Sequence, residues 1–186
     1  MDATVTENKL GWGAQDFALI GIDGKTHRLK DVAGPNGLVV VFMCNHCPYV
    51  RSVIGRMESE AQALRREGIG FVGINANDTE TYPEDSFENM QAFAAEHGLT
   101  FPYLLDETQD VAAAYGAVCT PDFFGFDKAM KLRYRGRLDA SRTTLVPNAR
   151  RELYEAMSQV ARTGEAPEQQ HPSMGCSIKW KPGRNP

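Results

Sequence analysis

Stretches that fit buried strands alternate along this chain with stretches that fit amphipathic helices. Residues 38–42 (Leu-Val-Val-Val-Phe) form an unbroken β-branched and aromatic run, too short for a helix, which predicts a buried central strand. In residues 48–66 the apolar side chains recur at helical spacing, and Gly68 follows as a stop signal. Residues 69–74 predict the next buried strand. The order strand, helix, strand is typical of an α/β protein.

The other elements follow from the same kind of pattern. Asp23-Gly24-Lys25 is a good hairpin turn, so strands are expected at residues 17–22 and 26–29. Asp85 and Glu88 are placed like a capping box at the start of a helix over 85–97, and the acidic loop 80–85 is expected at the surface. The remaining elements are a strand at 101–105, helices at 108–115 and 148–161, and an antiparallel pair of strands at 123–126 and 132–134.

These elements predict one α/β domain, a three-layer sandwich around a central mixed sheet with an N-terminal β-hairpin extension. The domain is expected over residues 1–163, of which 1–12 form a loose arm. Residues 164–186 hold four prolines and little periodicity, so they are expected to form an irregular C-terminal tail. Ile178 and Trp180 are the apolar residues that would hold this tail against the domain.

Composition and charge narrow the classes of function. The 186 residues carry a net charge of -4 without a long run of one sign, which argues against a nucleic-acid partner. No stretch approaches the length needed to span a bilayer, and the N-terminus has neither a basic start nor an apolar run, so we expect a cytoplasmic protein without a membrane partner. In a reducing cytosol the four cysteines are expected to be catalytic, metal-binding or simply buried, since structural disulfides are rare there.

The strongest chemical signal is the segment Cys44-Asn45-His46-Cys47-Pro48, which lies between the predicted central strand and the following helix. A C-x-x-C at such a turn indicates redox chemistry, because the free N–H groups at a helix start stabilise a thiolate. Pro48 suits the first helical position, which makes Cys47 the N-cap. We therefore predict Cys47 as the nucleophile and Cys44 as its resolving partner. His46 either tunes the thiolate or is an exposed turn residue.

Over about residues 10–160 the chain resembles the thioredoxin-like superfamily, specifically the peroxiredoxin-like proteins of its alkyl hydroperoxide reductase/thiol-specific antioxidant branch. The resemblance rests on Asp16-Phe17, the 23–25 turn, residues 42–50, Asn75-Ala76-Asn77-Asp78 and Cys119-Thr120-Pro121-Asp122-Phe123. It implies a thioredoxin-like sandwich in which Pro121 is cis and lies with Thr120 against the redox cysteines.

The peroxidase motif of that branch, P-x-x-x-[TS]-x-x-C, is not matched in either register. Counting back from Cys47 places Cys44 at the Thr/Ser position and Val40 at the Pro position. Counting back from Cys44 gives Val41 and Gly37. The hydroxyl that would orient a peroxide is therefore missing, and any peroxidase activity is expected to be weak.

Four further residues are candidates for auxiliary roles. Cys119 precedes Thr120, and Cys176 lies in the apolar part of the tail; they are either a second dithiol or resolving thiol, or two unrelated buried cysteines. Arg135 and Arg137 follow the last strand. They either stabilise a thiolate or anionic substrate, or they solvate an edge strand.

Two functions remain after these observations. The first is a thiol–disulfide oxidoreductase with weak peroxidase activity, acting on a disulfide or peroxide and recharged by an external thioredoxin or glutathione system. No bound organic cofactor is expected, because the chain has no dinucleotide or phosphate-binding glycine motif. The alternative is a protein that binds Zn or Cu(I) through Cys44, His46 and Cys47.

Overall fold

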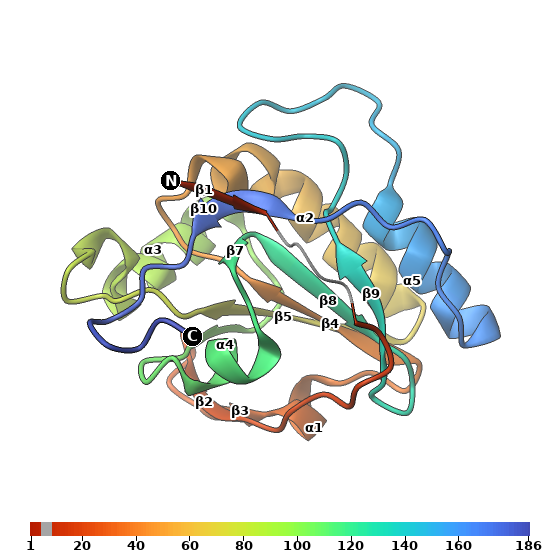
Figure 1. Cartoon of the computed structure of the whole chain (residues 1–186), viewed down its shortest axis with the longest axis horizontal. Helices are drawn as coiled ribbons and strands as arrows, with labels where there is room; N and C mark the ends of the chain where they lie inside the picture. The colour runs from red at the N-terminus through yellow and green to blue at the C-terminus, as the bar shows by residue number, and fades with distance from the viewer. Residues whose placement is uncertain (5–8) are drawn as a thin grey trace.

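The computed structural model describes residues 1–4 and 9–186, and its centre is a seven-stranded mixed sheet (Figure 1). The strand order in the described chain is β3-β2-β6-β5-β4-β8-β9. Strands β4, β5 and β6 are parallel, and the neighbours on either side are antiparallel. The bounds are β2 Ala18–Gly21, β3 Thr26–Arg28, β4 Gly37–Phe42, β5 Ile69–Asn75, β6 Tyr103–Leu105, β8 Asp122–Phe126 and β9 Leu132–Gly136.

Helices cover both faces of this sheet, which confirms the predicted three-layer sandwich. One face packs against α2 (Pro48–Arg66), α3 (Phe87–His97) and α5 (Glu152–Thr163). The other face packs against α1 (Leu29–Val32) and α4 (Asp110–Tyr115), as Figure 1 shows. The predicted N-terminal hairpin is present as β2 and β3, which are paired antiparallel around the 23–25 turn.

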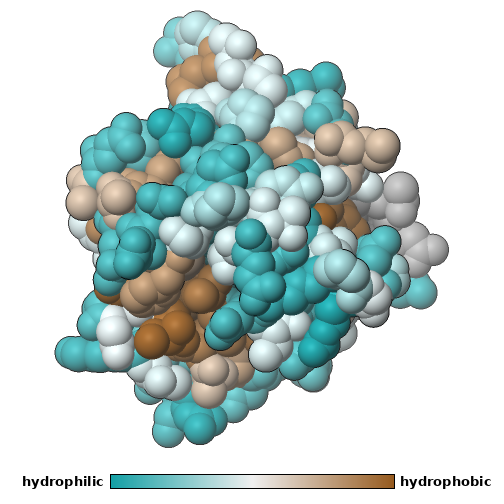
Figure 2. Space-filling model, turned by 90° about the vertical axis from the view of Figure 1, so that its left-hand side faces the viewer, coloured by the Kyte–Doolittle hydropathy of each residue, from teal (hydrophilic) through white to brown (hydrophobic). Residues whose placement is uncertain are grey.

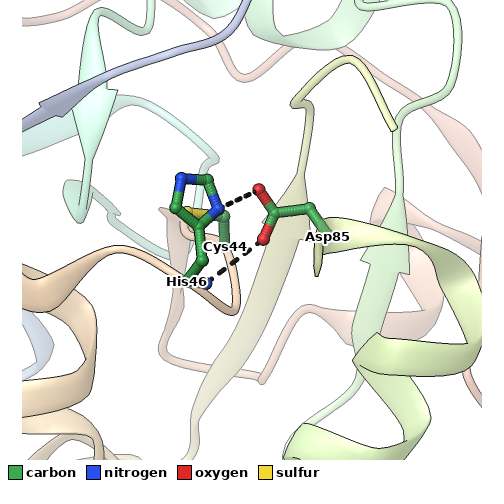
Figure 3. Close-up of side chains that lie close together, drawn as sticks. All are labelled: Cys44, His46 and Asp85. Carbon is green, nitrogen blue, oxygen red and sulfur yellow. Dashed lines mark hydrogen bonds and ion pairs between the residues drawn. The ribbon is translucent and has the colours of Figure 1, made fainter. Parts of the chain in front are cut away.

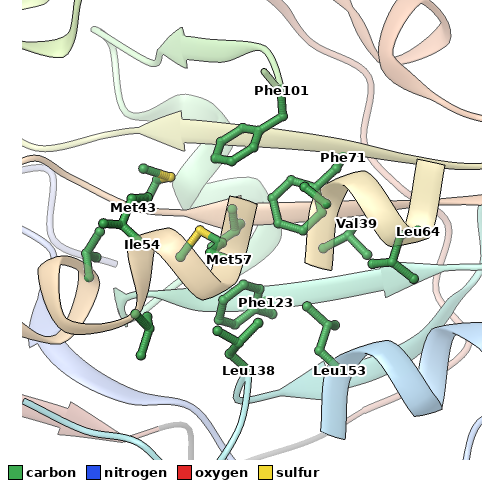
Figure 4. Packing of buried hydrophobic residues seen from close by; sticks show 14 of the residues in the cluster. Val39, Met43, Ile54, Met57, Leu64, Phe71, Phe101, Phe123, Leu138 and Leu153 are labelled. Atoms are coloured by element: carbon green, nitrogen blue, oxygen red, sulfur yellow. The ribbon is translucent and has the colours of Figure 1, made fainter. Parts of the chain in front are cut away.

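Alternation along β4 explains why the sheet is buried on both sides. Val39 and Val41 point into the cluster under α2, whereas Leu38 and Val40 point into the cluster under α4. All of them are fully buried, as expected for a central strand with helices on both faces. In Figure 4 the α2 side chains interlock with aromatic rings from β5, β8 and the residues before β6; the labelled members include Ile54, Met57, Leu64, Phe71, Phe101 and Phe123.

Both terminal segments are more ordered than the sequence indicates. Instead of lying in a loose arm, residues 2–4 form β1 (Asp2–Thr4), and instead of being irregular throughout, the tail contains β10 (Met174–Ser177). Together with β7 (Cys119–Thr120) they form a second sheet in the order β1-β10-β7. The interpretation of residues 5–8 as part of a loose arm lies outside the described residues. Strands this short show little hydrophobic periodicity, so the sequence does not predict them. They form because they pair with strands from other parts of the chain.

The tail continues from β10 across the α4 side of the sheet. Ile178 is buried and Trp180 packs on the same hydrophobic cluster. The backbone N–H of Lys179 donates to the Asn77 side chain at 2.9 Å, just after β5. The tail is thus held against the domain by its apolar residues, as their position in the sequence suggested.

The start of α3 differs from the prediction in a way that affects the site. The helix begins at Phe87 with Ser86 as N-cap, whose hydroxyl accepts the Asn89 N–H at 3.2 Å. Asp85 instead ends the 3-10 turn η1 (Pro83–Asp85) and is completely buried. The prediction that 80–85 is a surface loop is therefore wrong at Asp85, because this carboxylate has partners inside the protein.

The surface shown in Figure 2 is mainly hydrophilic, with hydrophobic residues gathered in small patches. Among the described residues, no helix has the length and apolar character required to cross a membrane.

Candidate active site

Cys44 and Cys47 lie where β4 gives way to α2, at the position that the sequence predicted. Both side chains are completely buried, with 0% exposure. Cys47 is the N-cap of α2 and Pro48 occupies its first position, as expected. Strand β4 positions the loop that carries the two cysteines. Because Cys47 is the N-cap of α2, it is the cysteine nearest the free N–H groups at the helix start.

The two thiols differ strongly in acidity. Hydrogen bonding from Cys44 is the largest influence on Cys47 and, with contacts from Cys176 and Thr120, outweighs burial and lowers the pKa of Cys47 to about 5. The pKa of Cys44 is raised well above its usual value by the same hydrogen bond, by burial and by the negative charge of Asp85. Cys47 is therefore the thiolate at neutral pH and Cys44 its protonated partner, which is the asymmetry that a nucleophile and a resolving thiol need.

The Thr120–Pro121 peptide bond is cis and lies against the cysteines, as the family resemblance implied. The carbonyl oxygen of Thr120 is 3.1 Å from Sγ of Cys47, and the Thr120 hydroxyl is 3.6 Å from Sγ of Cys44. A single residue thus contacts both sulfurs, one through its backbone and the other through its side chain.

A buried carboxylate that the sequence interpretation missed organises the loop between the cysteines (Figure 3). Asp85 accepts the backbone N–H of Asn45 at 2.8 Å. It also accepts the backbone N–H of His46 at 3.3 Å, which Figure 3 shows. Its other oxygen lies 2.5 Å from Nδ1 of His46 and accepts the Asn77 side-chain amide at 2.8 Å. Asn75 supports the same turn by donating to the Asp85 carbonyl at 2.8 Å. The signal in the sequence was the segment Asn75-Ala76-Asn77-Asp78, which begins at the last residue of β5, and the end of β5 lies beside the end of β4.

His46 is bound to Asp85 and lies in the turn with its side chain partly exposed; its role in tuning the thiolate stays a prediction. Its side chain is 28% exposed and its ring is parallel to that of Tyr82, with centroids 6.1 Å apart. Among the described residues, Cys44, His46 and Asp85 form a group of potential metal ligands. Their ligand atoms all lie within 4.8 Å of one another. This set contains Asp85 where the sequence suggested Cys47.

Cys176 reaches the site although it is 129 residues from Cys47 in sequence. It is the register partner of Thr120 in the β10–β7 pair, and its Sγ lies 2.8 Å from Sγ of Cys47. Burial and the contact with Cys47 raise the pKa of Cys176 to about 12. Cys119 is different: its sulfur faces the Pro121 carbonyl at 3.7 Å, and burial raises its pKa well above the usual value.

The two arginines are bound to carboxylates. Arg135 pairs with the buried Asp122 at 3.2 Å, and its guanidinium lies 4.5 Å from the ring centre of Phe124. Arg137 forms a bidentate pair with Glu152, at 2.7 and 3.0 Å. The first pair joins β9 to β8, and the second joins the residue after β9 to α5, so both arginines are engaged within the fold.

Comparison with known proteins finds similarity over most of the chain. A model of the AhpC/TSA family matches residues 10–135. The chain is 28% identical over 124 residues to the thiol-disulfide oxidoreductase ResA of Geobacillus thermodenitrificans, covering 67% of each chain. Across the curated relatives that it matches, the chain spans 57 to 67% of their length.

Solved structures give the same result for the fold. An uncharacterized conserved protein from Geobacillus kaustophilus is 46% identical, with a TM-score of 0.93 over 98% of each chain. The thioredoxin domain of a thiol-disulfide oxidoreductase from Bacteroides vulgatus is 19% identical, with a TM-score of 0.59 over 73% of this chain and 91% of the other. The fold is thioredoxin-like.

Proposed function

The chain belongs to the AhpC/TSA family, and from that premise we propose that it is a thiol–disulfide oxidoreductase whose reacting pair is Cys44 and Cys47. The observation that carries the proposal is the difference in acidity between the two thiols. Cys47, at the N-cap of α2, has a pKa lowered to about 5 through hydrogen bonding from Cys44, whereas the pKa of Cys44 is raised. The ResA relatives bear a name that describes the same chemistry.

The reaction begins when the Cys47 thiolate attacks one sulfur of a substrate disulfide. The substrate S–S bond breaks, the departing thiolate takes a proton from solvent, and a mixed disulfide remains on Cys47. A second thiol of the protein then attacks Sγ of Cys47 and passes its proton to the departing substrate sulfur. At the end of the reaction the substrate has been released as two thiols, and the proposed pair, Cys44 and Cys47, is joined in a disulfide.

Return to the dithiol requires an external dithiol reductant, for which we propose a thioredoxin or glutathione system. The substrate class is a disulfide, with peroxide as a poor alternative substrate. The residue at the Thr/Ser position of the peroxidase motif supports this choice: it is Cys44, so the hydroxyl donor that would be aimed at the peroxide is missing.

The experiment is reduction of a small aromatic disulfide by the prereduced protein, followed through release of the coloured thiol. Wild type is expected to release both halves of the reagent, and Cys47→Ser to lose the reaction. Cys119→Ser is the matched control, since Cys119 is buried with its sulfur facing the Pro121 carbonyl, and it should react like wild type. Release at the wild-type rate by Cys47→Ser protein would refute the proposal.

Binding of Zn or Cu(I) is the second candidate function, and the grouping of Cys44, His46 and Asp85 favours it. Against it, the Asp85 carboxylate already accepts hydrogen bonds from three N–H groups besides its contact with His46 Nδ1. Metal analysis of freshly purified protein decides between the two candidates. Stoichiometric metal that is lost in Cys44→Ser and Asp85→Asn variants would support the metal site.

A further inference from the structure

The contact between Cys47 and Cys176 depends on a close approach of two backbones. A Cβ on Gly175 would lie 1.9 Å from the Thr120 carbonyl oxygen, a distance that no side chain tolerates. Glycine at this position therefore allows β10 to pair with β7 and places Cys176 opposite Thr120. On its other edge β10 pairs with β1, and Tyr49 of α2 donates to the Asp2 carboxylate at 2.9 Å.

This arrangement covers the nucleophile. Cys47 has 0% exposure, whereas Cys176 is only partly buried. Since β10 contacts β7 through just two register pairs, local separation of these strands is the direct way for a substrate disulfide to reach Cys47. When β10 pairs again, it returns a thiol to the sulfur that now carries the mixed disulfide.

Cys176 is also better suited to that second attack than Cys44. The pKa of Cys44 is raised first by its hydrogen bond to Cys47, and then by its complete burial and by the negative charge of Asp85. The pKa of Cys176 is raised first by its partial burial and then by the Cys47 sulfur, and the positive charge of Lys179 opposes the rise. Once Cys47 is bound in a mixed disulfide, its contribution to the pKa of both thiols is lost. Complete burial and the Asp85 charge still oppose ionisation of Cys44, whereas Cys176 is only partly buried and has the positive charge of Lys179 near it.

We propose that Cys176 is a third reacting thiol of this site and the first to resolve the mixed disulfide on Cys47. The inference rests on the proposed function. The Cys176 sulfur forms a bond to Sγ of Cys47, the bond from Cys47 to the substrate sulfur breaks, and the Cys176 proton goes to the departing thiol. Cys44 then attacks Cys47, which gives the Cys44–Cys47 disulfide and returns Cys176 as a thiol. The external dithiol reductant restores the starting state.

The test uses the prereduced full chain and one equivalent of a small aromatic disulfide, with peptide mapping of the products. The Cys44→Ser protein is expected to release both halves of the reagent and to contain a Cys47–Cys176 disulfide. The Cys44→Ser/Cys176→Ser protein is expected to release one half and to keep the mixed disulfide on Cys47. Cys44→Ser/Cys119→Ser is the matched control and should behave like Cys44→Ser.

A Cys44→Ser protein that stalls at the mixed disulfide overturns the role of Cys176 and leaves the proposed function intact. Wild-type activity of the Cys47→Ser protein would refute both the role of Cys176 and the proposed function. A second measurement avoids dependence on folding of the variants: wild type is mixed with the reagent, quenched in acid at short times and mapped. We expect the Cys47–Cys176 disulfide to precede the Cys44–Cys47 disulfide, and the reverse order contradicts the proposal.

Discussion

The completely buried Asp85 carboxylate lies 2.5 Å from Nδ1 of His46, the residue next to Cys47. Its other oxygen receives the backbone N–H groups of Asn45 and His46. One carboxylate from the loop before α3 therefore sets the conformation of the segment between the two cysteines. Its charge also contributes to the raised pKa of Cys44, after the hydrogen bond to Cys47 and burial.

We expect Asp85→Asn to destabilise the reduced protein by about 1–3 kcal/mol, the range for removing a partner from buried polar groups. Asparagine keeps one acceptor oxygen but replaces the other with an NH2 donor. This donor cannot accept the hydrogen bonds from His46 and Asn77 that the carboxylate oxygen accepts. Urea unfolding of the reduced protein measures the change in the free energy of unfolding. Glu84→Gln is the matched control, because Glu84 is the exposed neighbour in the same turn, and it should change that free energy by less than about 0.5 kcal/mol. Equal effects of both substitutions would contradict the central role of Asp85.

The placement of Cys44 and Cys47 between β4 and α2 was predictable from sequence because the signals for it are local. The C-x-x-C segment, the apolar run before it and Pro48 after it determine strand, turn and helix within a dozen residues. The boundaries of β4 and α2 consequently agree with the prediction within one residue. The cis state of Pro121 came from family resemblance rather than from local pattern.

The contributions of Asp85 and Cys176 were not predictable in the same way. Asp85 fits a helix cap or an acidic surface loop as well as it fits a buried acceptor, and only packing of η1 against the end of β4 distinguishes these. Cys176 reaches Cys47 through pairing of β10 with a two-residue strand, which leaves no periodic signal. The sequence indicated the tail as a source of a resolving thiol but left that choice open.

The acidity of Cys47 is expected to appear directly in its alkylation rate. The thiolate is the reactive form, so modification by iodoacetamide should follow a titration with its midpoint at about 5 in the folded protein. Below that pH the thiol is protonated and the rate falls. In the unfolded chain the same cysteine should titrate at about 8.5. Peptide mapping assigns the label to Cys47.

Two substitutions at Cys44 separate its hydrogen bond from its packing. Cys44→Ser keeps a donor next to Cys47, so the midpoint should stay low. Cys44→Ala removes the donor that contributes most to the lowered pKa of Cys47, so the midpoint should rise. A wild-type midpoint near 8.5, or equal midpoints for both variants, would contradict this account of the site.

Gly175→Ala is expected to move β10 away from β7, because the new Cβ meets the Thr120 carbonyl oxygen. Cys47 should become more accessible, and its alkylation at fixed pH should be faster than in wild type. Gly55→Ala is the control: a Cβ there meets nothing within 4 Å, and alanine in a helix should stabilise α2 by up to about 1 kcal/mol. Unchanged alkylation of Cys47 in Gly175→Ala would show that β10 does not limit access.

Peroxide is expected to oxidise the protein slowly compared with a disulfide. A peroxidatic thiolate needs donors aimed at the oxygen that leaves, and one positioned donor is worth about 10²–10³ in rate. Cys44 occupies the Thr/Ser position of the family motif, and its S–H is a weak donor that is already hydrogen-bonded to Cys47. Arg135 and Arg137 are bound to Asp122 and Glu152 within the fold.

Stopped-flow oxidation of reduced protein by hydrogen peroxide, compared with a small aromatic disulfide, measures the difference. Cys44→Thr restores the hydroxyl of the motif, whereas Cys44→Ala has no donor at this position. The Cys44→Thr protein should therefore react with peroxide faster than the Cys44→Ala protein. Peroxide reacting with wild type orders of magnitude faster than with a free thiol would contradict the prediction. It would mean that a donor other than these arginines stabilises the breaking O–O bond, and the Thr120 hydroxyl beside Cys44 is the group to substitute next.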